Sequence, residues 1–127
     1  MFLNPVFADR SEDTLHKEAI VWDTHNDLAY RVLYEGLDIG KPLPAGHVDI
    51  PKLKEGGVDV QVVACFVQNF LYPDKCDEQA FKLIQAMRRA IEDNSDSVEL
   101  ARTGLDVERI IKAGKNAVTP TKRSLKY

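Results

Sequence analysis

A histidine and a carboxylate lie two positions apart, directly after the first apolar run of the sequence. The run ends at Trp22, and His25 and Asp27 follow it. Residues two apart in an extended chain point to the same side, so this imidazole and carboxylate can meet at one point. Zinc takes nitrogen from neutral imidazole and oxygen from carboxylate at ~2.0–2.2 Å. The pair therefore predicts half of a metal site. A surface turn, with the histidine hydrogen-bonded by its neighbour, is the alternative interpretation of so short a pattern.

Three other groups of residues could be read as chemistry but favour structural roles. Asp23 is expected to orient the loop at His25 or to cap a turn, in preference to binding metal. His47 and Asp49 share the spacing of the first pair but precede a strand, so a structural hydrogen-bonded turn away from the chemical face is expected. The glycines at 56–57 precede no helix N-terminus, so they indicate the end of a helix and not a phosphate loop.

The elements that must position these residues alternate between helices and strands. Residues 58–67 form the clearest strand, because they are rich in β-branched residues and become continuously apolar. Residues 80–91 show the apolar spacing of an amphipathic helix, for which Asp74 or Asp77 is the expected cap. The other predicted elements are a short helix from Ser11, a strand at 19–22, helical pieces at 28–33 and from Pro51, a final helix capped by Asp106, and a strand stub at 115–118.

Alternating strands and helices with buried strands predict an α/β fold with right-handed crossovers. The expected divisions are a leading arm and short helix at 1–18, one domain at 19–118, and an irregular basic tail at 119–127. The tail is expected to be irregular because it is polar and Pro120 removes a donor where a central strand would continue. Residues 98–102 are expected to be a short apolar link, and Trp22 a core residue.

Composition limits the class of protein. The chain has 127 residues, of which 44% are hydrophobic and 29% charged, as is typical of a soluble globular domain. A net charge of -3 gives no reason to expect nucleic acid as a partner. No apolar run approaches the ~20 residues of a transmembrane helix, and no basic segment typical of a secretory signal begins the chain. A cytoplasmic location is therefore the default expectation. Cys65 and Cys76 are expected to be free thiols, Cys65 in the core.

Two longer motifs resemble one enzyme family. Residues 21–28 read VWDTHNDL, residues 47–58 read HVDIPKLKEGGV, and a strand follows at 60–67. Their order and spacing resemble the N-terminal portion of the membrane (renal) dipeptidase family of zinc metallopeptidases. In that family D-x-H-x-D-L ends the first strand, and H-x-D-x-P-x-x-x-x-G-G leads into the second. The resemblance extends from about residue 15 to residue 118.

This resemblance implies a (β/α)₈ TIM barrel that hydrolyses dipeptides with two zinc ions, one of them bound by the residues that match His25 and Asp27. The chain would hold the first two strand–helix units and a stub of the third. The family's bridging glutamate after the third strand has no counterpart in residues 119–127, which contain no acid, and the histidines of the second metal have none either.

We therefore expect at most one partial zinc site, in a truncated and inactive fragment that is prone to self-association through its exposed sheet edge. A non-catalytic α/β interaction or scaffold fragment is the alternative. The sequence does not indicate which dipeptides would be cleaved.

Overall fold

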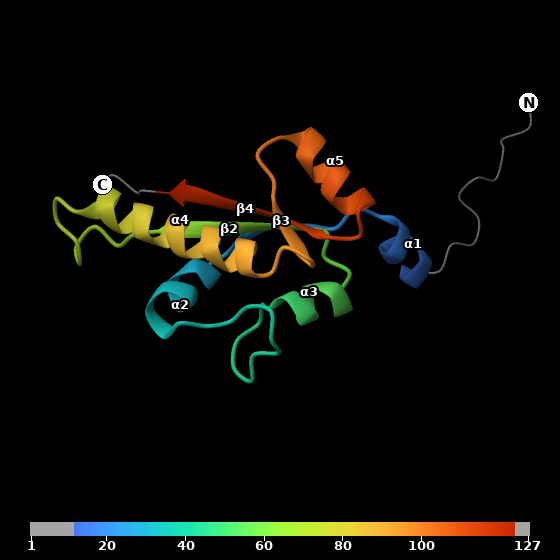
Figure 1. The fold of residues 1–127 in the computed structure, drawn as a ribbon, viewed down its shortest axis with the longest axis horizontal. Coiled ribbons are helices and arrows are strands. Elements are labelled where there is room, and N and C mark those ends of the chain that lie inside the picture. Colours follow the sequence, from blue (N-terminus) through green and yellow to red (C-terminus); the bar gives the residue numbers. More distant parts are fainter. Residues whose placement is uncertain (1–11, 124–127) are drawn as a thin grey trace, which may run out of the picture.

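A computed structural model describes residues 12–123 as helices around a parallel sheet (Figure 1). The sheet has four strands in the order β1-β2-β4-β3, and each neighbouring pair is parallel. In chain order the elements are α1 (Glu12–Glu18), β1 (Trp22–Asn26), α2 (Leu28–Glu35), α3 (Ile50–Glu55), β2 (Val60–Phe66), α4 (Cys76–Asp93), β3 (Val98–Leu100), α5 (Gly104–Lys112) and β4 (Asn116–Arg123). The α/β class, and the parallel pairing of the first strand with the strand within 58–67, are confirmed.

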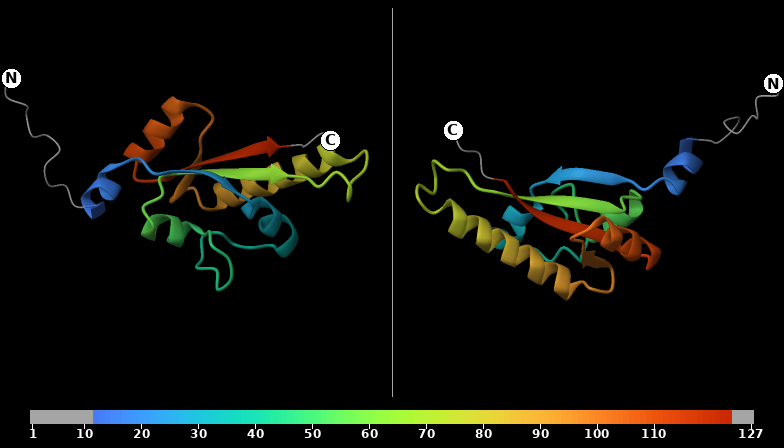
Figure 2. Two further views of the ribbon diagram at one scale, coloured as in Figure 1. Left: turned by 180° about the vertical axis from the view of Figure 1, so that it is seen from behind. Right: turned by 90° about the horizontal axis from the view of Figure 1, so that it is seen from above.

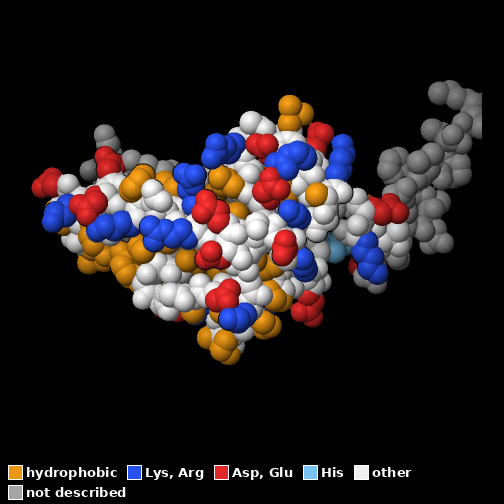
Figure 3. Space-filling model, viewed as in Figure 1, with side chains coloured by type: hydrophobic (Ala, Val, Ile, Leu, Met, Phe, Trp, Pro, Cys, Tyr) orange, Lys and Arg blue, Asp and Glu red, His pale blue; other side chains and the backbone are white. Residues whose placement is uncertain are grey.

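The larger core lies between the sheet and the helices α2 and α4. Val63 and Cys65 of β2 pack in one cluster with Leu83 and Met87 of α4. Met87, within the amphipathic helix predicted at 80–91, is fully buried. The outward side of α4 is charged, and Figure 3 shows rows of basic and acidic side chains over this helix. Burial raises the pKa of the Cys65 thiol to about 11, so this free cysteine is an inert core residue.

A smaller core lies on the opposite face, under α5. Val60 and Ala117 pack there against Val107 and Ile110 of α5. Figures 1 and 2 show α5 on the side of the strands away from α2 and α3. The predicted burial of Trp22 is wrong: this residue pairs with Val60 on the edge strand β1 but is 52% exposed. The described residues of this smaller core come from α5, β2, β4 and the residue after β3, and none comes from β1. The helix α5 therefore does not cover Trp22.

The last strand is longer than the sequence predicted. Residues 119–123 continue β4 and pair with β2, so the expectation of an irregular chain from residue 119 is wrong for this part, while 124–127 lie outside the described residues. Ala117 donates to the Asp59 carbonyl on the β2 side, whereas Asn116 donates to Ser97 and Val118 accepts from Ala101 on the β3 side. Alternation therefore directs the nitrogen of Pro120 toward the β3 side. On that side the carbonyl of Ala101, just after β3, accepts a hydrogen bond of 3.0 Å from Oγ1 of Thr119, so it does not depend on an N–H at residue 120.

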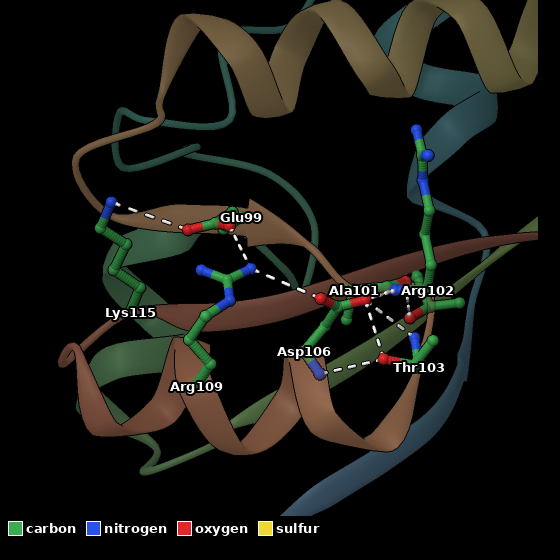
Figure 4. A network of polar contacts seen from close by, with 8 residues as sticks. Glu99, Ala101, Arg102, Thr103, Asp106, Arg109 and Lys115 are labelled. Carbon is green, nitrogen blue, oxygen red and sulfur yellow. Dashed lines mark hydrogen bonds and ion pairs between the residues drawn. The ribbon is translucent and has the colours of Figure 1, made fainter.

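Helix boundaries follow the sequence more closely than the caps do. The helix α2 ends at Gly36, whose φ of 63° is left-handed. However, Lys75 is the N-cap of α4, with no side-chain capping bond, in place of the predicted aspartates. Thr103 is the N-cap of α5 in place of the predicted Asp106, which completes a reciprocal capping box from the third helical position, as Figure 4 shows. The predicted link at 98–102 contains the strand β3, whose Glu99 is paired with Arg109 of α5.

No helix within residues 12–123 combines the length and the apolar composition needed to cross a bilayer.

Candidate metal centre

The predicted metal pair lies at the C-terminal end of β1. His25 is the fourth of the five β1 residues, and Asp27 comes immediately after the strand. The Nε2 atom of His25 lies 3.6 Å from Oδ1 of Asp27, and the two side chains are 51% and 68% exposed. Two protein ligands bound ~2.1 Å from one tetrahedral ion would lie ~3.4 Å apart. The imidazole nitrogen and the carboxylate oxygen therefore fit a shared zinc ion.

The pair is an incomplete coordination sphere. Among residues 12–123, no group of three or more His, Cys, Asp or Glu side chains could surround one ion. Structural zinc sites use four protein ligands and catalytic zinc sites use three. The described residues therefore supply two ligands at most, and further ligands must come from water, substrate or other protein groups.

Asp23 and Asn26 bind backbone groups beside the pair. Oδ1 of Asp23 accepts a hydrogen bond of 3.0 Å from the N–H of His25. Oδ1 of Asn26 accepts one of 3.0 Å from the N–H of Leu28. Asp23 thus takes the orienting role that the sequence predicted for it.

Asp27 of the pair borders a cavity at the end of the sheet. The cavity has a volume of about 600 Å³, and Asp27, Tyr30 and Arg31 lie on one side of it. Ala64, Phe66 and Gln68 line it from the end of β2, and Gly46, His47 and Val48 from the loop before α3. The expectation that His47 lies away from the chemical face is wrong, because the loop brings this residue to the cavity that Asp27 lines.

Two anchors hold that loop. NH1 of Arg31 donates to the carbonyl of Ala45 over 2.8 Å, and the same guanidinium is paired with Glu35 on α2. Gly46 has a φ of 103°, and a Cβ there would lie 2.1 Å from NH1 of Arg31. The next residue, His47, is therefore placed by a backbone conformation at residue 46 that favours glycine.

Asp49 is the second anchor and has the structural role that the sequence predicted. Its side chain is fully buried and accepts from the N–H groups of Leu43 and Lys52, at 2.9 and 2.8 Å, and from Nζ of Lys52 at 2.6 Å. Burial alone would raise the pKa of the Asp49 carboxyl. The hydrogen bonds from Lys52 and Leu43 outweigh burial, so this pKa lies below its ordinary value.

Tyr30 and Phe66 line the cavity and are functional candidates that the sequence reasoning did not find. Tyr34, one helical turn after Tyr30, lies outside the lining of this cavity. The hydroxyl of Tyr34 is hydrogen-bonded to Tyr72 and Gln79 at 3.1 Å, and these contacts join α2 to α4 and to the loop before it. The hydrogen bond to Tyr72 and partial burial raise the pKa of Tyr34 to about 12. Phe66 is the last residue of β2 and Gln68 lies two residues beyond it, much as His25 and Asp27 lie at the end of β1; this shared position is the sequence signal that could have identified them.

Comparisons with known proteins agree on one family. A family model described as "Membrane dipeptidase (Peptidase family M19)" matches residues 9–126. The dipeptidase ataJ of Aspergillus terreus is 30% identical over 128 residues, which cover 90% of this chain and 30% of that protein. The chain thus spans about 30% of the length of this relative.

Solved structures share the fold. The probable dipeptidase PvdM of Pseudomonas aeruginosa matches with a TM-score of 0.74 and 19% identity, over 87% of this chain and 29% of that chain. A metallopeptidase of Rhodobacter sphaeroides, bound to a phosphinate mimic of the dipeptide L-Ala-D-Ala, matches with a TM-score of 0.68 and 18% identity, over 83% and 38% of the respective chains.

Proposed function

The chain belongs to the membrane dipeptidase family of metallopeptidases, and on this premise we propose that it carries the first metal-binding segment of a zinc-dependent dipeptidase. His25 and Asp27 are the proposed ligands. The observation that carries the proposal is the 3.6 Å separation of their ligand atoms at the end of a parallel strand. Active sites of barrel enzymes form at the C-terminal ends of the strands.

We further propose that the sheet is a sector of a (β/α)₈ barrel. The support is that β1, β2 and β4 are parallel and adjacent, and that α2 and α4 follow β1 and β2 along the chain. In a barrel, catalytic groups come from the ends of several strands. A sector with one such pair would therefore depend on other strands for the rest of its site.

The proposed substrate class is the dipeptide. Zinc, when bound, would lower the pKa of a coordinated water and polarise the peptide carbonyl. His25 and Asp27 would hold the ion at the edge of the cavity, whose volume of about 600 Å³ is within the usual range for small-molecule sites. Tyr30 and Phe66 would provide apolar walls for a substrate side chain.

The 127-residue chain by itself is proposed to bind zinc weakly and to hydrolyse no dipeptide. Two protein ligands leave two positions of a tetrahedral ion unfilled by protein, so micromolar or weaker affinity is expected. A two-metal mechanism also needs ligands for a second ion, and the described residues offer no such cluster.

The test is a zinc titration of the chain and of two matched histidine variants. His25→Ala should weaken zinc binding by about tenfold or more, because it removes one of two ligands. His16→Ala is the control, since this exposed histidine is bonded to the Gly56 carbonyl at 2.9 Å, away from the pair. Binding that survives His25→Ala unchanged would refute the ligand assignment.

An activity assay tests the second part of the proposal. Release of amino acids from a panel of dipeptides should stay at background with added zinc. Zinc-dependent turnover that disappears in His25→Ala would show that the site is more complete than proposed here.

One observation favours a second, non-catalytic role as an interaction or scaffold piece. Ile20 and Trp22, at the open edge of the sheet, are 60% and 52% exposed. An open strand edge beside exposed apolar side chains is a site for pairing with another chain. Sedimentation equilibrium should show self-association that Trp22→Lys weakens, and a monomer at all concentrations would exclude this role for the edge.

A further inference from the structure

Strand β1 loses its regular register just before the metal pair. Asp23 is paired with Gln61 and Asn26 with Val63, so three residue steps of β1 match two of β2. Such a bulge changes the side to which the following side chains point. It also removes backbone groups from the ladder, and a backbone N–H that leaves the ladder needs another acceptor.

Asp23 supplies that acceptor for His25. Its Oδ1 lies 3.0 Å from the N–H of His25, within the irregular segment. This contact closes a local turn of the kind that aspartate side chains stabilise. The conformation that directs the His25 imidazole is therefore held by the side chain two positions earlier.

Asn26 performs a related task at the start of α2. The first N–H groups of a helix lack intrahelical partners, and an aspartate at the N-cap commonly binds one of them. Asp27 occupies the N-cap of α2, but its side chain makes no capping bond. Oδ1 of Asn26 instead accepts from the N–H of Leu28 at 3.0 Å. The Asp27 carboxylate is thereby left available, 3.6 Å from the His25 imidazole.

We propose that Asp23 and Asn26 are positioning residues for the metal pair: they bind the backbone on either side, so that His25 and Asp27 can share one ion. This inference rests on the proposed function, since it assigns roles around the same zinc site. Neither residue is a ligand. Their shared property is a side-chain oxygen that accepts a backbone N–H two residues later.

Gln61 supports the same segment from β2. Its side chain is 1% exposed, and Nε2 lies 3.5 Å from the carbonyl of Asp23. Nδ2 of Asn26 and Oε1 of Gln61 are both buried without a partner. The oxygen of the Asn26 amide group therefore makes the useful contact, whereas its buried nitrogen, without a partner, lowers stability.

The experiment distinguishes the effect of the side-chain oxygen of Asp23 and Asn26 from the effect of the negative charge of Asp23. Asp23→Ala and Asn26→Ala remove the acceptor, whereas Asp23→Asn and Asn26→Ser keep a side-chain oxygen. Zn²⁺ and Co²⁺ are titrated into the 127-residue chain and into each folded variant. Both alanine variants should bind about tenfold more weakly and change the visible spectrum of bound Co²⁺, as loss of a group that orients a ligand does. Asp23→Asn and Asn26→Ser should recover most of the affinity.

Asp59→Ala is the matched control. Oδ2 of Asp59 also accepts from a backbone N–H next to β1, that of Val21 at 2.8 Å, but before the strand begins. Its loss should reduce stability without changing the metal affinity of the folded protein. Equal weakening in Asp59→Ala would reduce the effect to general destabilisation and overturn the inference.

Two further outcomes would also overturn it: unchanged affinity in both alanine variants, or an Asp23→Asn variant as weak as Asp23→Ala, which would make Asp23 a ligand through its charge. If an alanine variant does not fold, Asp23→Asn and Asn26→Ser decide the question.

A readout without metal separates this inference from the proposed function. Amide hydrogen exchange in the metal-free chain should be faster at His25 in Asp23→Ala and at Leu28 in Asn26→Ala. Unchanged exchange would refute the positioning contacts themselves. Zinc binding that survives His25→Ala would instead refute the metal assignment, whatever the exchange shows.

Discussion

Two His-x-Asp pairs with the same spacing have opposite environments in this protein. His25 and Asp27 end a strand, and the Asp27 side chain is 68% exposed with its carboxylate beside an imidazole. His47 and Asp49 precede a helix, and Asp49 is fully buried with Lys52 as its ion-pair partner. The spacing alone does not distinguish the proposed metal pair from a structural turn.

The difference lies in which residue satisfies the helix N-terminus. Asp49 is the N-cap of α3 and accepts the N–H of Lys52 itself. At α2 the neighbouring Asn26 takes a backbone N–H, and the N-cap Asp27 makes no capping bond. An aspartate whose side chain caps a helix is unavailable to a metal ion. An aspartate that makes no capping bond keeps its carboxylate oxygen atoms free to bind one.

The strongest test of this contrast is Asp49→Ala. This change removes the cap of α3, the contact with Leu43 and the partner of the Lys52 ammonium. The free energy of unfolding should fall by about 2–4 kcal/mol, the range expected for loss of a cap together with buried hydrogen bonds to a charged group. Denaturant unfolding gives the value, with the exposed Asp96→Ala as control, and a loss below about 1 kcal/mol would contradict the buried-anchor role.

A smaller effect should appear as acid sensitivity. Because the folded-state pKa of Asp49 is lowered, the unfolded chain binds a proton more readily than the folded chain does. The stabilisation is therefore complete above the unfolded pKa of about 3.9 and is lost as pH falls through the lower folded pKa. The stability difference between the native chain and Asp49→Ala should be constant from pH 7 to about pH 5 and shrink below about pH 4. If this stability difference grew as the pH fell, the pKa of Asp49 would be raised in the folded chain and not lowered.

The smallest expected effect is at the other aspartate. Asp27→Ala should change the free energy of unfolding by no more than about 0.5 kcal/mol, because the side chain is exposed and caps nothing. The same variant should lose zinc binding to the extent that His25→Ala does. Chemical denaturation and zinc titration of one preparation measure both, and a large stability loss would mean that Asp27 is a structural residue like Asp49.

The sequence by itself determined most of the element types and predicted the His25–Asp27 pair. Apolar period and β-branched content identified β2 and α4. The spacing of His25 and Asp27 directly after an apolar run predicted a shared point, and the motifs around them predicted the family. These features are local, so the order of residues along the chain is enough to read them.

Only the tertiary structure decided what depends on neighbours distant in the sequence. Pro120 continues a strand because the Ala101 carbonyl on the β3 side accepts from the Thr119 hydroxyl and needs no N–H at residue 120. Trp22 is exposed because α5 covers strands other than β1. His47 reaches the cavity because Arg31 of α2 holds the loop by the Ala45 carbonyl. Each of these outcomes depends on contacts between segments that lie far apart along the chain, and no local sequence pattern relates such segments. Only the fold therefore determines whether a hydrogen-bonding group has a partner and whether a side chain is covered.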